Sequence, residues 1–147
     1  MLDDTDKAII RELQEDGRIP YAQLAPRVGL SQAATRQRVN RLTEGGVIQI
    51  VAVTDPRMLG LGCQAMLGIT VSGDVRQVAD VIAAVSSAEY VVITAGRYDL
   101  LVEAVCGDAD TLLELVNHTI RPIPGVASVE IMSYLRLVKQ AYDWGTG

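Results

Sequence analysis

The sequence predicts an α+β protein in two parts, a group of three helices followed by a unit in the order βαββαβ. Two observations support this prediction. Apolar residues recur at helical spacing as far as Glu44, where Gly45 and Gly46 end the pattern. From Gln64 onward, short runs rich in β-branched residues alternate with helical segments. A βαββαβ unit packs as an antiparallel sheet with both helices on one face, the ferredoxin-like arrangement.

The first two helices are predicted from caps, spacing and stops. A capping carboxylate, Asp3 or Asp4, precedes the first helix, and Asp16-Gly17 ends it. The apolar positions of this helix share one face and are Ile9, Ile10 and Leu13. A second helix is predicted over residues 21–28, and Gly29 then permits a sharp bend.

The third predicted helix begins after Ser31, a favoured N-cap, and ends at Glu44. Its spacing places Thr35, Val39 and Leu42 on one face, which we assign to the core. The opposite face and its flanks carry small, amide and basic side chains: Ala33, Arg36, Gln37, Arg38, Asn40 and Arg41.

Charge is distributed unevenly along the chain. The stretch from Gly17 to Thr43 contains five arginines and no Asp or Glu, although the formal net charge of the chain is −5. We therefore expect these arginines to face no local counter-charge. A helix, a glycine bend and a second capped helix have the spacing of a helix-turn-helix, whose second helix enters the DNA major groove. A carboxylate on that helix would repel the phosphate backbone.

On this interpretation, Arg36, Arg38 and Arg41 contact phosphates or guanine, while Gln37 and Asn40 read base edges. The alternative is that the arginines form a solvated helix face, as most charged runs do. The glycine bend, the Ser31 cap and the glycine stop stand where a helix-turn-helix requires them around the arginine-bearing helix. We therefore favour DNA binding.

A domain boundary is predicted after the third helix. Residues 47–53 are β-rich, and Asp55-Pro56 breaks this run before a connection that contains two glycines. The predicted parts are a DNA-binding domain (1–53), a linker (54–63), a βαββαβ domain (64–140) and a tail (141–147). In the tail, Tyr142 and Trp144 form either an oligomer contact or a loosely packed end.

The second part is predicted to contain four strands and two helices. The strands cover residues 65–71, 89–94, 99–105 and 126–139, and the helices run from Asp74 or Val75 to Val85 and from Asp108 or Asp110 to Ile120. A tight turn at residues 96–98 connects the second and third strands.

Six stretches of the sequence, taken in their order and spacing, carry a resemblance to a known family. They are LDDTDKAIIRELQEDGRI at 2–19, LAPRVGLS at 24–31, RVNRL at 38–42, GGVI at 45–48, AGRYDLLVEA at 95–104 and PGVASVEIMSYLRLVK at 124–139. In this order and with these gaps, the chain resembles the Lrp/AsnC (feast/famine) family of prokaryotic transcription regulators. The resemblance implies an N-terminal winged helix-turn-helix and a C-terminal ferredoxin-like βαββαβ domain for effector binding and oligomerisation. It also implies dimers, often assembled into octamers, with amino acids or related small metabolites as effectors.

The resemblance also assigns candidate site residues. The family's recognition helix falls on Ser31 to Glu44, with Arg38 at the position that is most typically basic. The candidate DNA-binding residues are Ser31, Gln32, Ala33, Arg36, Gln37, Arg38, Asn40 and Arg41. The family's effector site lies at an interface between dimers and includes a Gly-x-x-Asp turn. The candidate effector-binding residues are Gly96, Arg97, Tyr98, Asp99 and Ile131.

The chemistry of the turn suits an amino acid. Gly96 allows exposed backbone amides that can hold a carboxylate, and Asp99 can pair with an ammonium. The alternative is a plain hairpin whose Asp99 caps backbone groups locally.

Three positions depart from the family pattern. Pro20 stands where the family usually has a Ser-like cap, and Pro26 lies within the second helix. An internal proline removes one backbone hydrogen bond and costs about 3 kcal/mol, so we expect this helix to be kinked or short. Ile131 occupies a position where the family often has Thr, which leaves open a more apolar ligand or none.

The sequence indicates a cytoplasmic protein without a membrane partner, since it has neither a signal peptide nor a long apolar run. Cys63 and Cys106 lack the spacing of a zinc site or a disulfide framework, and we interpret both as small buried hydrophobes. We expect no metal, no cofactor and no enzyme activity. His118 is the only histidine and has no catalytic partner spacing around it, while Glu103 and Glu114 are isolated.

These observations predict a sequence-specific DNA-binding transcriptional regulator whose activity is modulated by a small-molecule effector, an amino acid or a related metabolite. Its expected partners are double-stranded DNA with a roughly palindromic operator and a second copy of the chain, in a homodimer or an octamer. The alternative is a stand-alone metabolite-sensing βαββαβ protein with weak or no DNA binding.

Overall fold

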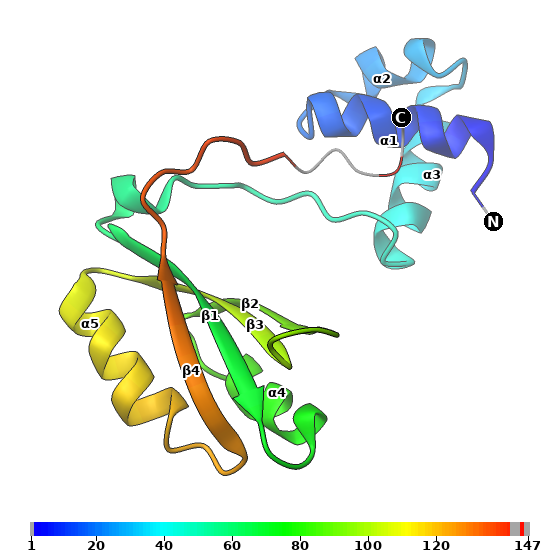
Figure 1. Ribbon diagram of the computed structural model, residues 1–147. Coiled ribbons are helices and arrows are strands. Elements are labelled where there is room, and N and C mark those ends of the chain that lie inside the picture. The colour runs from blue at the N-terminus through cyan, green and yellow to red at the C-terminus, as the bar shows by residue number, and fades with distance from the viewer. Residues whose placement is uncertain (1, 142–144, 146–147) are drawn as a thin grey trace. The chain divides into compact units, whose positions relative to one another are not determined.

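The computed structural model describes residues 2–141 and Gly145, and the chain divides into two compact units (Figure 1). One unit comprises Met1–Val53 with Lys139–Gly147, and the other comprises Thr54–Val138. Tyr142 and Trp144, for which the sequence leaves two interpretations, lie outside the described residues.

Three helices form the first unit: α1 (Asp4–Glu15), α2 (Tyr21–Arg27) and α3 (Gln32–Glu44). Asp3 caps α1, because its carboxylate accepts a hydrogen bond of 2.7 Å from the backbone N–H of Asp6. Ser31 caps α3 in the same way, accepting from the N–H of Ala34 at 3.2 Å. Gly29 has a φ of 69° in the turn between α2 and α3. The predicted helix-turn-helix is confirmed.

The three helices share one apolar core, whose buried residues are Ile9, Ile10, Ile19, Leu24, Val39 and Leu42. Thr35 is also buried, and its hydroxyl donates to the carbonyl of Ser31 at 2.9 Å, which satisfies its hydrogen-bonding capacity inside the core. The predicted core face of α3 is therefore confirmed. Its burial leaves the opposite face of the helix toward solvent.

Helix α2 is short, as the prolines predicted. It spans seven residues, and Pro26 lies in its last turn. Pro20 precedes the helix without a side-chain cap, and the N–H of Leu24 donates to the carbonyl of Pro20 at 3.0 Å. Backbone hydrogen bonds alone therefore begin this helix.

The β-rich run at residues 47–53 does not form a strand, since this segment has no regular secondary structure. Its exposed apolar side chains are Val47, Ile50, Val51 and Val53. A strand requires a neighbouring strand for its backbone N–H and C=O groups, and the described part of the first unit contains only helices as regular elements. The composition of the segment reflects β propensity, but pairing decides whether a strand forms.

The second unit is built on a four-stranded antiparallel sheet in the order β2-β3-β1-β4. Its elements are η1 (Pro56–Leu59), β1 (Cys63–Val71), α4 (Val75–Ala83), β2 (Ala88–Ile93), β3 (Leu100–Cys106), α5 (Ala109–Glu114), η2 (Leu115–Ile120) and β4 (Val126–Ser133). The predicted βαββαβ order is confirmed. None of the helices within residues 2–141 is long and apolar enough to cross a lipid bilayer.

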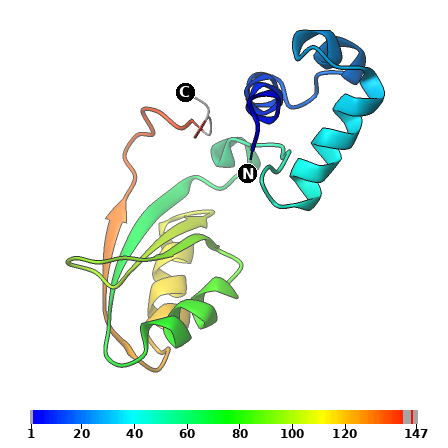
Figure 2. The same ribbon diagram turned by 90° about the vertical axis from the view of Figure 1, so that its right-hand side faces the viewer.

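One face of this sheet is covered by helices, and the other is open. Alternate residues of β1 and β3 form the covered face: Ala65, Leu67, Ile69, Leu100, Val102, Ala104 and Cys106. They belong to one core with residues of α4, α5 and η2, and the helices lie on the same side of the sheet (Figures 1 and 2). The intervening residues, such as Met66 and Leu101, face the open side.

The last strand ends earlier than predicted, at Ser133 rather than near Lys139. Ser133 pairs with Ala65, and the N–H of Tyr134 donates to the carbonyl of Gln64 at 2.9 Å. Because β1 begins at Cys63, the chain beyond Tyr134 has no partner strand along this edge. The predicted second helix is confirmed, with its last part, η2, wound as a π-helix.

Candidate nucleic-acid interface and effector turn

The solvent-facing side of α3 forms a shallow concave surface with the start of α2. Its lining residues are Tyr21, Gln32, Ala33, Arg36, Gln37 and Asn40. All of these except Tyr21 are candidate DNA-binding residues, and the structure brings them together on one exposed face. Small Ala33 permits close approach, and the amides of Gln37 and Asn40 can both donate and accept hydrogen bonds. This is the chemistry that reading base edges requires.

Arg36 lies over an aromatic ring at this surface. Its guanidinium carbon is 5.4 Å from the centroid of the Tyr21 ring, within the range of a cation–π contact. Tyr21 is partly buried against the helical core, so its ring is anchored. The contact holds Arg36 on the exposed face that Gln37 and Asn40 share.

Arg38 and Arg41 have carboxylate partners, and the expectation that the arginines face no counter-charge is wrong. Arg38 Nη1 is 2.6 Å from Asp3 Oδ2 and 2.8 Å from Asp6 Oδ1. Arg41 Nη2 is 2.8 Å from Asp6 Oδ1. Arg27 likewise donates to Glu12 at 2.7 Å. The acids precede Gly17 in the sequence, but packing of α1 against the other helices brings them beside the arginines.

The ion pairs shift the pKa values of their members. The hydrogen bond from Arg38 lowers the pKa of the Asp3 carboxyl below its usual value, and the same bond raises the pKa of Arg38. The hydrogen bond with Glu12 raises the pKa of Arg27 in the same way. These arginines stay charged at any pH at which DNA binding is measured.

The second candidate site is the turn between β2 and β3, which projects from the sheet (Figure 2). Thr94 makes two hydrogen bonds across the base of this turn. The N–H of Thr94 donates to the carbonyl of Asp99 at 2.9 Å, and the Thr94 hydroxyl donates to the carbonyl of Tyr98 at 2.6 Å. Arg97 Nη2 lies 3.4 Å from Glu130 of β4, and the Tyr98 hydroxyl donates a short hydrogen bond to the same carboxylate. The turn is therefore tied to β4.

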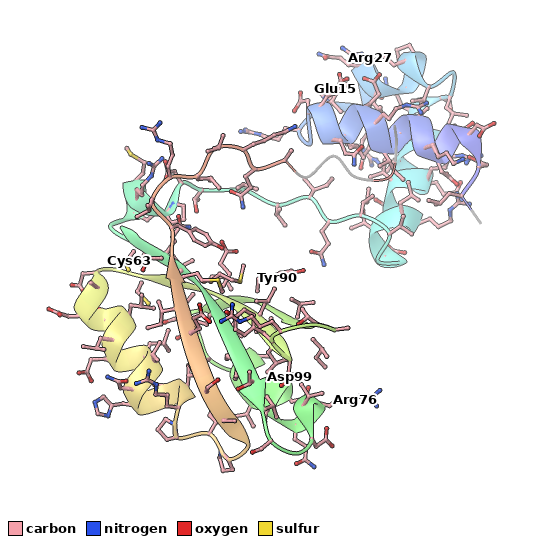
Figure 3. All side chains as sticks on the ribbon, in the orientation of Figure 1. Glu15, Arg27, Cys63, Arg76, Tyr90 and Asp99 are labelled. Atoms are coloured by element: carbon pink, nitrogen blue, oxygen red, sulfur yellow. The ribbon has the colours of Figure 1, made fainter. Side chains whose placement is uncertain are left out.

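The Asp99 carboxylate is used within the fold. Asp99, labelled in Figure 3, lies beside the C-terminal end of β1, and its Oδ2 accepts from the N–H of Val71 at 2.7 Å. The pairing of β1 with β4 shifts register between Thr70 and Val71, and the carboxylate satisfies a backbone group at this irregularity. The geometry therefore agrees with the local capping alternative for Asp99.

Ile131 does not join the turn within one chain. It pairs with Leu67, whose side chain is on the helix-covered face. Its neighbour Glu130 pairs with Gly68 on the open face, where it meets Tyr98. Because successive side chains of a strand point to opposite faces, Ile131 and Tyr98 lie on opposite sides of the sheet.

Sequence reasoning missed three residues at these sites: Tyr21, Asp6 and Glu130. A signal was available for Asp6, since its spacing of three and four from Ile9 and Ile10 places it on the core face of α1. Glu130 and Tyr21 had no comparable signal, because their roles depend on contacts between distant elements.

His118 and the two cysteines belong to neither set of candidate site residues. His118 is exposed, with Nε2 3.5 Å from Glu114 on the preceding turn. Cys106 is buried, as predicted, whereas Cys63 is only partly buried. Their surroundings indicate surface and packing roles.

Comparisons with known proteins agree with this architecture. Residues 2–43 match the AsnC-type helix-turn-helix domain, and residues 64–147 match a C-terminal dimeric alpha+beta barrel domain of AsnC regulators. An HTH-type transcriptional regulator of Pyrococcus abyssi is 33% identical over 98% of this chain and 90% of the relative. HTH-type transcriptional regulator FL11 of Pyrococcus horikoshii is 32% identical over 97% of this chain and 95% of its own.

Among solved structures, a transcriptional regulator from Neisseria meningitidis in complex with L-Met superposes with a TM-score of 0.88. It is 26% identical and the match covers 99% of this chain and 97% of that one. Both comparisons therefore extend over both units of the chain.

Proposed function

The chain belongs to the Lrp/AsnC family of transcriptional regulators, and from this premise we propose that α3 reads a specific DNA sequence in the major groove. The observation that carries the proposal is the exposed face of α3, where Ala33, Arg36, Gln37 and Asn40 line one concave surface. The buried opposite face fixes the helix on its domain. Ser31 caps the helix, and Gln32 extends the surface at its first turn.

The proposed arrangement is a dimer that places two α3 helices in successive major grooves. Such a dimer reads a roughly palindromic site whose half-sites are about 10 base pairs apart. The open face of the sheet supports dimerisation, because it carries Met66, Tyr90, Leu101 and Met132 without covering helices. The family domain matched by this part of the chain is described as dimeric. Light scattering tests the assembly, with masses of twice or eight times 15.8 kDa expected for a dimer or an octamer.

The division of labour along the chain is also a proposal. Residues 1–53 bind DNA, residues 54–63 link the two parts, residues 64–140 bind effector and form oligomers, and residues 141–147 are a tail. The division of the structure between Val53 and Thr54 supports the first of these boundaries.

Fluorescence anisotropy tests DNA binding directly. The wild-type protein is used to select a duplex from a random pool, and its affinity is titrated across salt beside a scrambled duplex. About six phosphate contacts per dimer would produce a slope near −5 of log affinity against log salt. Arg36→Ala is expected to weaken selected-duplex binding, whereas Arg76→Ala on α4, with the same charge change, is expected to leave it unchanged (Figure 3). Selection of no duplex at low salt would favour the ligand-sensing alternative.

We also propose that an amino acid or a related metabolite modulates this activity at an oligomer interface that includes Gly96, Arg97, Tyr98 and Asp99. L-Met bound to the Neisseria meningitidis regulator supports the ligand class. Backbone amides of the turn and the Arg97 guanidinium are suited to a carboxylate. Because Ile131 lies across the sheet from Tyr98, it would join the site from a different subunit.

Calorimetry with a panel of amino acids, beginning with L-Met, tests the effector site. Arg97→Ala is expected to weaken binding of any amino acid that the wild type takes, and Arg121→Ala, an exposed arginine after η2, serves as the matched control. Equal binding by wild type and Arg97→Ala would remove this turn from the site.

A further inference from the structure

Asp6 of α1 is a buried carboxylate, with a side chain only 3% exposed. Arg38 Nη1 donates to its Oδ1 at 2.8 Å, and Arg41 Nη2 donates to both of its oxygens at 2.8 and 2.9 Å. The N–H of Asp3 donates to its Oδ2 at 3.3 Å. A buried carboxylate is tolerated only where such partners compensate for lost hydration. Its burial therefore couples the start of α1 to α3.

The two arginines are held to different extents. They lie three positions apart on α3, so one carboxylate reaches both. Arg38 also donates to Asp3 at 2.6 Å, and its side chain is only 28% exposed. Among the described residues, Arg41 is held through Nη2 alone, and its side chain is 62% exposed. Because a guanidinium carries five N–H donors in a rigid fork, Arg41 keeps donors that point away from Asp6.

We infer that Asp6 is a positioning residue for DNA recognition, which sets the orientation of Arg41 and, with Asp3, of Arg38. The inference rests on the proposed DNA-binding function and deepens it. Arg38 braces α3 against α1, and Arg41 presents its remaining donors to a phosphate. Side chains that are already ordered lose less conformational freedom on binding, so a preset Arg41 favours one register of α3 on the duplex.

The direction of the effect separates positioning from simple electrostatics. A carboxylate near a DNA-binding surface repels phosphates, so removing its charge by Asp6→Asn would strengthen binding to every duplex if charge alone mattered. Positioning predicts the opposite for the selected duplex. Arg41 would no longer be held, and the advantage of the selected duplex over a scrambled one would fall.

The test measures this advantage as the ratio of affinities of the full-length protein for the selected and scrambled duplexes. Asp6→Asn is expected to lower the ratio by about tenfold. Asp4→Asn is the matched control, because Asp4 lies in the same turn but is exposed and 3.9 Å from Lys7. It makes the same charge change and is expected to keep the wild-type ratio. A ratio for Asp6→Asn at or above that of wild type overturns the inference.

Two further results distinguish failure of the proposed DNA-binding function from failure of the positioning role of Asp6. If wild type selects no duplex, the proposed function itself fails. If circular dichroism shows that Asp6→Asn is unfolded at the assay temperature, Arg41→Lys decides, since lysine keeps the charge but lacks the further guanidinium donors that point away from Asp6. Arg41→Lys is expected to lower the ratio while Arg76→Lys on α4 preserves it. An unchanged ratio for a folded Arg41→Lys also overturns the inference.

Discussion

The ring of Tyr98 lies directly against the backbone of Gly68, so close that a Cβ at position 68 would come within 2.7 Å of the ring. Gly68 is buried in β1 between Leu101 of β3 and Glu130 of β4. The ring therefore crosses the open face of the sheet and reaches the Glu130 carboxylate on the far side. This contact ties the candidate effector turn to the sheet on which oligomers are proposed to form.

Gly68→Ala is expected to displace the Tyr98 ring and to lower the free energy of unfolding by about 1 to 3 kcal/mol through overpacking. The ring must then leave Glu130, and the proposed effector affinity should fall with it. Urea denaturation measures the stability change. Gly62→Ala is the matched control, because a Cβ there would meet its nearest neighbour at an ordinary 3.6 Å. Equal stability of the two variants would contradict the packing described for Tyr98.

Asp99→Ala is expected to destabilise the second unit even without ligand. The change leaves the N–H of Val71 without its 2.7 Å acceptor, which costs about 1 to 2 kcal/mol of unfolding free energy. Asp99→Asn keeps an acceptor oxygen and should lose less. Urea denaturation compares these variants with Asp80→Ala, an exposed carboxylate on α4. If Asp99→Ala and Asp80→Ala are equally stable, Asp99 is free for a ligand and has no capping role.

Alkaline pH is expected to destabilise the fold through Tyr134. Burial, with the charge and hydrogen bonding of Glu103, raises the pKa of Tyr134 to about 12. An unfolded tyrosine has a pKa of about 10, so between pH 10 and 12 the unfolded chain loses this proton while the folded chain keeps it. The stabilising contribution is therefore complete below pH 10 and is lost as the pH rises toward 12.

Absorbance titration at alkaline pH checks this expectation, because Tyr134 should ionise near pH 12 and Tyr134→Phe should remove that late phase. Tyr98 also has a raised pKa, owing to its hydrogen bond with Glu130, and its phase should persist in Tyr134→Phe. In thermal melts, the variant should lose less stability than wild type between pH 10 and 12. Identical pH profiles would show that Tyr134 ionises alike in both states.

Helices could be predicted from sequence where residues close together in the chain determine them. Asp3 and Ser31 cap their helices by contacts within four residues, and the burial of Thr35 and Val39 follows from helical spacing. The segment at 47–53 shows the limit of such signals. Its composition favours a strand, but a strand depends on a partner that composition does not specify.

The candidate sites could be predicted as sets of residues but not as geometries. Counting charges along the chain left the arginines of α3 unpaired, because the count ignores how α1 folds back to bring Asp6 beside them. Similarly, the resemblance assigns Ile131 and Tyr98 to one effector site, and the register of β4 on β1 places them on opposite faces of the sheet within one chain. A shift of one residue would have reversed that result, and sequence periodicity did not determine the register.

The contact between Tyr21 and Arg36 leads to a prediction about DNA affinity. Tyr21→Ala removes the ring beneath the guanidinium, and loss of an exposed cation–π contact should weaken binding to the selected duplex about two- to fivefold. Tyr21→Phe keeps a ring and should bind almost as wild type does. Fluorescence anisotropy at fixed salt measures both, with thermal melts to show that the helical core is intact.

A double-mutant cycle identifies the route of this effect, because Tyr21 also packs against the helical core. If Tyr21 acts by holding Arg36, then Tyr21→Ala should cause no further loss of affinity in an Arg36→Ala background. If the two losses add in full, Tyr21 contributes to DNA binding independently of Arg36. A non-additive result would show that Tyr21 contributes to DNA recognition through Arg36. Tyr21 would then belong to the recognition surface that Arg36 lines together with Gln37 and Asn40.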